Sequence, residues 1–190
     1  MHGSFTVVFD ACVLYPALLR NVMLQFATTE LFRTRWTDAI HDEWTRSLRN
    51  DKPDITPEQI ARYRSAINDA VPDCLVTGYE PLMKGLVLPD ANDRHVLAAA
   101  LRCRAEVIVT SNLRDFPDEV LSPLGVRVEH PDEFVLHLID LAPATVCVAI
   151  KTVRARLKKP EYSADALLDR LCDHGLVGSA SRLREFSRML

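Results

Sequence analysis

Acidic side chains stand at several points where this sequence changes from one kind of secondary structure to another. Asp10 directly follows the apolar, β-branched run 5–9, and Asp115 comes a few residues after a second such run. Glu43 borders the apolar face of a helical segment, and Asp93 precedes an alanine-rich stretch. Clustered carboxylates repel one another unless a cation joins them, and their oxygens suit Mg²⁺ or Mn²⁺. If these acids meet, they predict phosphodiester hydrolysis by a metal-activated water.

Each acid also has an ordinary structural explanation. An aspartate after a strand often caps a helix or begins a turn, and a glutamate on a helix is often only solvated. The stretch LPDANDRHVLAAA at 88–100 contains Asp90, Asn92 and Asp93, although one such residue is enough for an N-cap. These residues therefore indicate a site only if the fold brings them together.

The elements that must position the acids alternate along the chain. Strands are predicted at 5–9, 32–36, 73–76, 106–110 and 126–129. Helices are predicted at 16–32, through Glu43, from a Thr56 cap to about Ala70, and from the 88–100 stretch to about Arg104. This order predicts an α/β fold with a mainly parallel sheet. In such a sheet, active groups collect beyond the carboxyl ends of the strands, where Asp10 would lie.

After Pro131 the pattern becomes helical throughout. Segments are predicted near 131–141, 143–158, 163–174 and 178–189. Their apolar faces could pack on the core or on a partner, and they carry Leu167, Leu168, Leu171, Leu176, Leu183 and Phe186. The sequence therefore predicts two parts, an α/β domain at 1–130 and an all-helical extension at 131–190.

Composition and charge narrow the class of protein. A chain of 190 residues with 48% hydrophobic residues fits one domain with a small appendage, and no apolar run reaches the roughly 20 residues that span a bilayer. The five cysteines are odd in number and lack a C-x-x-C pair, which indicates reduced thiols in a cytoplasmic protein. Residues 151–190 carry nine Lys or Arg against five Asp or Glu, so a basic tail follows an acidic body.

Four stretches resemble the PIN domain family, especially the VapC-like ribonucleases of toxin–antitoxin systems. They are VVFDACVLYP at 7–16, RWTDAIHDEW at 35–44, LPDANDRHVLAAA at 88–100 and VIVTSNLRDFP at 107–117. The family pattern places an acid after the first strand, a Glu on an early helix, an Asp opening a later helix, and an acidic or polar residue after the next strand. The resemblance implies a three-layer α/β/α fold, followed here by a helical extension.

The resemblance also implies roles for individual residues. The family's metal-binding acids fall on Asp10, Glu43 and Asp93, and Asp90 then becomes the helix cap or a supporting partner. The fourth position is open, because Asn112 stands where many members carry an acid and Asp115 could substitute. The implied catalytic and metal-binding set is Asp10, Glu43, Asp93 and Asp115. The implied supporting set is Asp90, Thr110, Ser111 and Asn112.

The activity implied is that of a Mg²⁺- or Mn²⁺-dependent endoribonuclease. Similar toxins are held inactive by a cognate antitoxin and are often homodimers. Candidate contacts to the RNA backbone, which could equally be plain surface charge, are Arg94, Lys151, Arg154, Arg156, Lys158 and Lys159. His41 and His95 flank the proposed site, but we interpret them as ordinary surface or partly buried histidines.

Two other functions are considered. A haloacid-dehalogenase-like phosphohydrolase also begins with a strand ending in Asp, but it needs a second Asp two residues later, where this chain has Cys12. A non-catalytic PIN domain serving as an RNA or protein interaction module is disfavoured by Asp10, Glu43 and Asp93, while Asn112 leaves it open.

Overall fold

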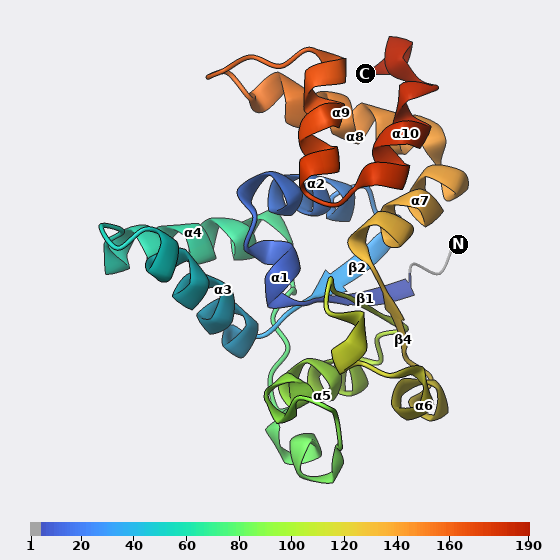
Figure 1. Ribbon diagram of the computed structural model, residues 1–190. Helices are drawn as coiled ribbons and strands as arrows, with labels where there is room; N and C mark the ends of the chain where they lie inside the picture. Colours follow the sequence, from blue (N-terminus) through green and yellow to red (C-terminus); the bar gives the residue numbers. More distant parts are fainter. Residues whose placement is uncertain (1–4) are drawn as a thin grey trace.

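A four-stranded parallel sheet lies at the centre of the computed structural model, which describes residues 5–190 (Figure 1). The strands are β1 Phe5–Phe9, β2 Phe32–Arg35, β3 Val107–Val109 and β4 Arg127–Glu129, in the spatial order β2-β1-β3-β4. β1 pairs with both β2 and β3, and all three pairings are parallel. The carboxyl ends of the strands therefore lie at one edge, with Asp10 and Thr110 following the adjacent strands β1 and β3.

Helices cover both faces of this sheet. Figure 1 shows α5 on one side of the sheet and α1, α2 and α7 on the other. The helices that precede α7 are α1 Ala11–Leu14, α2 Ala17–Ala27, α3 Asp38–Asp51, α4 Pro57–Ala70, α5 Arg94–Cys103 and α6 Asp118–Leu121. Short 3₁₀ turns are η1 Glu80–Gly85, η2 Ala91–Asp93, η3 Leu113–Asp115 and η4 Ser122–Leu124. The predicted α/β fold with a parallel sheet is confirmed.

Local capping signals explain where the central helices begin. Thr56 and Gln59 form a reciprocal capping box at the start of α4, as the sequence predicts. Thr37 caps α3, because its hydroxyl accepts a hydrogen bond from the backbone N–H of Ile40 at 3.1 Å. This cap fixes the beginning of the helix that carries Glu43.

Two predicted elements are wrong in extent. The helix predicted at 16–32 ends at Ala27, because the chain turns through Glu30 with φ of 60° before Phe32 begins β2. The segment predicted as a strand at 73–76 makes only one bridge, in which Trp36 is paired with Leu75. The backbone at Asp73 adopts φ of 58°, so this segment turns instead of continuing as a strand.

The last part of the chain is helical, as predicted. It consists of α7 Pro131–Leu141, α8 Pro143–Arg156, α9 Ala164–Asp173, α10 Val177–Arg184 and η5 Ser187–Met189. Its predicted apolar face packs inward: Phe186 is partly buried, and the fully buried leucines are Leu167, Leu168, Leu171, Leu176 and Leu183. Asp132 joins α7 to α10 by accepting hydrogen bonds from the backbone N–H groups of Gly178 and Ser179, at 2.8 and 2.7 Å.

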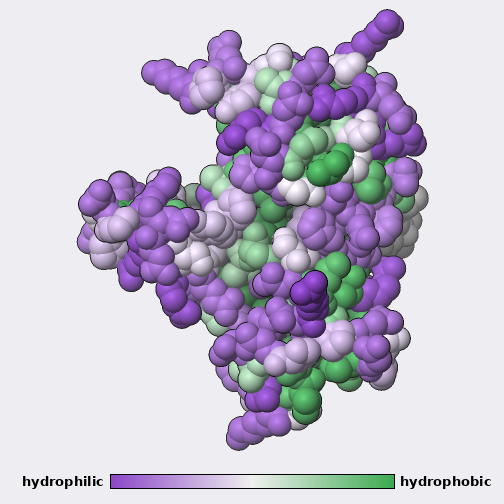
Figure 2. All heavy atoms as spheres, viewed as in Figure 1, coloured by the Kyte–Doolittle hydropathy of each residue, from purple (hydrophilic) through white to green (hydrophobic). Residues whose placement is uncertain are grey.

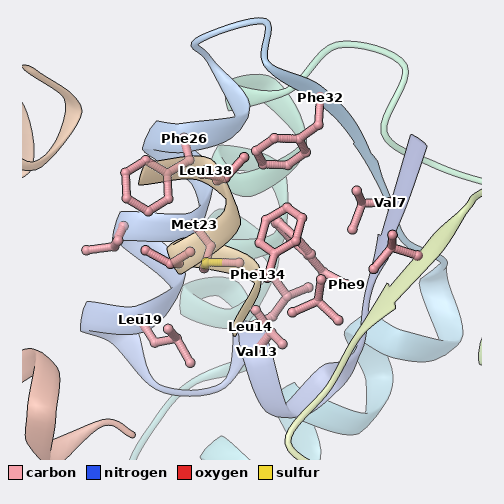
Figure 3. Close-up of a cluster of buried hydrophobic side chains, with 14 of the residues drawn as sticks. Val7, Phe9, Val13, Leu14, Leu19, Met23, Phe26, Phe32, Phe134 and Leu138 are labelled. Carbon is pink, nitrogen blue, oxygen red and sulfur yellow. The ribbon is translucent and has the colours of Figure 1, made fainter. Parts of the chain in front are cut away.

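A cluster of aromatic rings joins the sheet to the helical part. Phe134 on α7 meets Phe32 edge to face, with ring centroids 5.0 Å apart, and also meets Phe9 at 6.3 Å. Figure 3 shows these rings between β1, α2 and α7, together with Met23 and Leu138. The extension therefore shares one continuous apolar core with the sheet. The division at residue 130 remains a prediction, and residues 1–4 lie outside the described part.

Candidate active site

Asp10 is held rigidly at the carboxyl edge of the sheet. Its side chain is 4% exposed and caps α1, since Oδ1 accepts a hydrogen bond from the backbone N–H of Ala11 at 2.6 Å. Oδ2 accepts a hydrogen bond from Thr110 Oγ1 at 2.7 Å. The Thr110 hydroxyl in turn accepts one from the backbone N–H of Asn112 at 3.0 Å. The Asp10 carboxylate is therefore both a helix cap and the end of a hydrogen-bond chain from the loop after β3.

Cys12 completes this cluster on the side of α1. Its sulfur lies 3.3 Å from Asp10 Oδ2 and from Thr110 Oγ1, and it accepts the backbone N–H of Ser111 at 3.2 Å. Burial, followed by the negative charge of Asp10, raises the pKa of the thiol to about 12. The thiol therefore stays protonated at neutral pH and acts as a small hydrogen-bonding group. Ser111 reaches the site through its backbone N–H.

Glu43 projects from α3 and is held by a histidine that the sequence interpretation set aside. His95 Nε2 lies 2.8 Å from Glu43 Oε1, across 52 positions of sequence. His95 is 7% exposed and therefore buried, whereas the Glu43 side chain is 30% exposed. The sequence interpretation of His95 as an ordinary surface or partly buried histidine did not foresee this contact with a proposed site residue.

Asp93 stands at the end of η2, directly before α5. Burial, followed by the charges of neighbouring carboxylates, raises the pKa of its carboxyl from 3.8 to about 6. In decreasing order of effect, these neighbours are Asp10, Asp115, Asp90 and Glu43. Asp90 caps η2 by accepting the backbone N–H of Asn92 at 2.8 Å. Within the stretch 88–100, the cap is therefore Asp90, and the acid that faces the other carboxylates is Asp93.

Three of the predicted acids line one hollow of about 530 Å³, between α1, α3 and the start of α5. Its wall includes Asp10, Glu43 and Asp93, and Asn112 as well. Asp115 is not part of this wall, although its charge acts on Asp93. Figure 2 shows the surface hollowed and mainly hydrophilic between the arm of α3 and α4 and the part that carries α5.

A second hollow of about 580 Å³ shares Glu43 and Asp93 with the first and adds an arginine. This residue is Arg46, which is exposed and lies one helical turn after Glu43 on α3. The sequence interpretation missed it, although its spacing from Glu43 places both side chains on one face of the helix. A larger hollow, of about 760 Å³ between α2, α4 and α8, is lined by no carboxylate.

The oxygen donors around the first hollow fit a hard dication. Carboxylate and amide oxygens are the ligands that Mg²⁺ and Mn²⁺ take, and each carboxylate oxygen that already accepts one hydrogen bond keeps a further lone pair. Within residues 5–190, however, no three His, Cys, Asp or Glu side chains stand together as a complete metal-binding group. The donor chemistry fits, and the side chains would have to turn further toward one another to share an ion.

A buried polar network anchors α3 behind Glu43. Asn68 Oδ1 accepts hydrogen bonds from Trp36 Nε1 at 2.9 Å and from His41 Nε2 at 2.8 Å. Trp44 Nε1 donates to the other ring nitrogen of His41 at 2.8 Å. Because Trp44 donates to Nδ1, the proton of His41 is at Nε2. His41 is fully buried, so it is a core histidine and not a surface one.

Replacing Asn68 with alanine is expected to destabilise the protein by roughly 2–3 kcal/mol, because two buried donors would lose their shared acceptor. Urea denaturation followed by tryptophan fluorescence measures the change in the free energy of unfolding. Arg62→Ala, an exposed change on the same helix, is the matched control and should shift the midpoint little. If Asn68→Ala lowers the free energy of unfolding no more than the control does, the network does not anchor α3.

The predicted RNA-binding cations are placed differently from one another. Lys151, Lys158 and Lys159 are exposed. Arg154 is used inside the fold, because its guanidinium donates to the backbone oxygens of Leu190 and Tyr162 at 2.8 and 3.4 Å. The remaining two are Arg156, which donates to Gln25 Oε1 at 2.8 Å, and Arg94, which is half-buried at the start of α5.

This sheet, with acids gathered at its carboxyl edge, is matched by a family model described as PIN domain over residues 6–114, and the chain belongs to the PIN domain family. Residues 131–185 match a second model, described as the VapC50 C-terminal domain. The chain is similar to a protein of Mycobacterium tuberculosis (strain ATCC 25618 / H37Rv) named "Putative ribonuclease VapC50", with 41% identity over 111 residues. The match covers 56% of this chain and 65% of that protein. No solved structure matches the chain.

Proposed function

We propose that this protein is a Mg²⁺- or Mn²⁺-dependent endoribonuclease. The observation that carries the proposal is the meeting of Asp10, Glu43 and Asp93 around one hollow, from three elements far apart in sequence. The raised pKa of Asp93 supports it, because mutual repulsion of carboxylates is relieved by a bound cation. The similarity to a protein named "Putative ribonuclease VapC50" supports RNA as the proposed substrate class.

The chain's own residues would divide the work of hydrolysis. Asp10, Glu43 and Asp93 would hold the ion, with Asn112 or Asp115 at the fourth position. When bound, such an ion activates water and neutralises charge on a phosphoryl group. Thr110 fixes the direction of the Asp10 carboxylate through its 2.7 Å hydrogen bond. One of the carboxylates would orient the attacking water by accepting its proton.

The RNA backbone would be held by a cation beside this site and by cations of the helical extension. Arg46 lines the second hollow beside Glu43 and Asp93, where a phosphate next to the cleaved bond would lie. The exposed Lys151, Lys158 and Lys159 would contribute long-range attraction to RNA from the extension. Arg154 contributes less to this surface, because its guanidinium is bound within the fold.

The proposed biological role is that of the toxin of a type II toxin–antitoxin pair. This role rests on the likeness to VapC-like proteins and implies a cognate antitoxin that covers the site, with a homodimer as the proposed assembly. The cytoplasm is the proposed location, where RNA is available and the five free cysteines stay reduced. Among residues 5–190, no helix is long and apolar enough to cross a membrane.

The test is cleavage of total cellular RNA by the purified chain. Fragments should form with Mn²⁺ and not with EDTA. Asp10→Asn should slow cleavage by roughly 100-fold or more. Loss of a residue that only orients a metal ligand already lowers metal affinity or activity about 10- to 100-fold, and Asp10 would be a ligand itself. Asp118→Asn, an exposed change on α6, is the matched control and should cleave like wild type. Cleavage that survives both EDTA and Asp10→Asn would overturn the proposed function.

A second candidate is a PIN domain that binds RNA or protein without cutting. Asn112 favours it, because an amide lines the hollow where many family members carry an acid. Binding of RNA without cleavage in Mn²⁺ would support this candidate. The haloacid-dehalogenase-like alternative is not retained, because the chain belongs to the PIN domain family and Cys12 stands where that reaction needs an acid.

A further inference from the structure

The pair formed by His95 and Glu43 links α5 to α3 within the site. Nε2 of the histidine lies 2.8 Å from Oε1 of the glutamate. An ionised carboxylate only accepts hydrogen bonds, so the proton must be on Nε2. Among residues 5–190, Glu43 Oε2 has no hydrogen-bond partner. One oxygen of Glu43 is therefore held and the other is free to accept a ligand.

His95 has no second polar contact that would explain its place in the fold. It is 7% exposed, and its Nδ1 is buried with no hydrogen-bond partner among the described residues. A buried polar atom without a partner opposes folding, so an apolar residue would suit this position better on grounds of stability alone. The feature that a histidine supplies here is the donor aimed at Glu43.

We propose that His95 is a positioning residue, which acts through Glu43 by holding one carboxylate oxygen so that the other is presented to the metal and substrate. This inference rests on the proposed function. Glu43 needs such a partner because it is 30% exposed on a long side chain, which otherwise samples several rotamers. Hydrogen bonds to metal ligands typically change metal affinity or activity about 10- to 100-fold.

Three substitutions separate this role from simple packing. Gln at position 95 can place an N–H close to where Nε2 lies, Asn is too short to reach Glu43, and Leu fills space without a donor. We expect His95→Asn and His95→Leu to weaken Mn²⁺ binding about 10- to 100-fold in isothermal titration calorimetry, and His95→Gln to stay within a few-fold of wild type. The same order is expected for single-turnover RNA cleavage.

A double-mutant cycle shows whether the effect passes through Glu43. In a Glu43→Gln background, His95→Leu should cause little further loss of Mn²⁺ affinity. Equal Mn²⁺ affinity of wild type, His95→Asn and His95→Leu would overturn the inference while leaving the proposed function intact. A wild-type protein that neither binds Mn²⁺ nor cleaves RNA would overturn both. If His95→Leu fails to fold by circular dichroism, the Gln and Asn variants decide the question.

Discussion

Replacing Asp93 with asparagine is expected to have opposite effects on activity and stability. RNA cleavage should fall roughly 100-fold or more, because loss of a metal ligand costs at least as much as loss of a residue that only orients one. Without metal, the same variant should melt at a higher temperature than wild type near pH 8. The substitution removes a charge that burial and the neighbouring carboxylates both disfavour, so the functional carboxylate opposes folding.

The stability effect should depend on pH in a defined direction. The pKa of Asp93 is raised from 3.8 to about 6, so folding favours the protonated carboxyl. Its contribution to stability is complete below pH 3.8 and is lost as the pH rises through about 6. Asparagine does not titrate. The stability of the variant relative to wild type should therefore increase as the pH rises from about 4 to about 7, and this difference should then level off.

Melting temperatures measured in EDTA at several pH values test this expectation. Asp118→Asn is the control, because it removes an exposed carboxylate outside the hollow and should show no comparable gain. Adding Mn²⁺ should reverse the order at pH 8, since a cation that binds only the folded wild type raises its stability. A wild-type protein that melts at or above the temperature of Asp93→Asn at pH 8 in EDTA would contradict a destabilising charge at Asp93.

The sequence predicts most of the fold because local signals act within single elements. The capping box of Thr56 and Gln59 specifies the start of α4, and the β-branched run 5–9 specifies a buried strand. The segment 73–76 has similar local character, yet it pairs at only one bridge because Asp73 turns the chain. Whether a short apolar segment continues as a strand depends on its neighbours in space, which periodicity does not record.

The meeting of Asp10 with the loop after β3 could be predicted because parallel topology brings strand ends together. Glu43 and Asp93 lie on α3 and η2, and the family resemblance singled them out. The sequence could not predict whether Asn112 or Asp115 faces the hollow, because this depends on how the η3 turn directs each side chain. Asn112 lines the hollow and Asp115 does not. His95 was missed for a related reason. Its partner Glu43 is 52 residues away, and no local spacing indicates a contact between α5 and α3.

Replacing Phe134 with alanine is expected to cost about 3–5 kcal/mol of folding free energy, which is the usual range for emptying a large aromatic site in a core. The ring is 1% exposed and meets three rings of the sheet edge to face, Phe5, Phe9 and Phe32. Figure 3 shows Phe134 of α7 beside Phe9 of β1 and Phe32 of β2, so the cavity would be shared by the sheet and the helical part. Guanidinium denaturation followed by circular dichroism measures the loss.

Leu141→Ala is the matched control, because Leu141 lies at the end of the same helix and is 60% exposed. It should change stability little. Phe134 belongs to residues 131–190, and its ring partners belong to residues 1–130. The two predicted parts should therefore unfold in one transition, and Phe134→Ala should shift that whole transition. Two outcomes would contradict this coupling: a loss of unfolding free energy below about 1 kcal/mol in the Phe134→Ala variant, or a separate early unfolding of the helical part. Either would favour a domain that ends at residue 130 and folds by itself. The expected result instead makes the extension part of the core that holds β1, and through β1 it supports the position of Asp10.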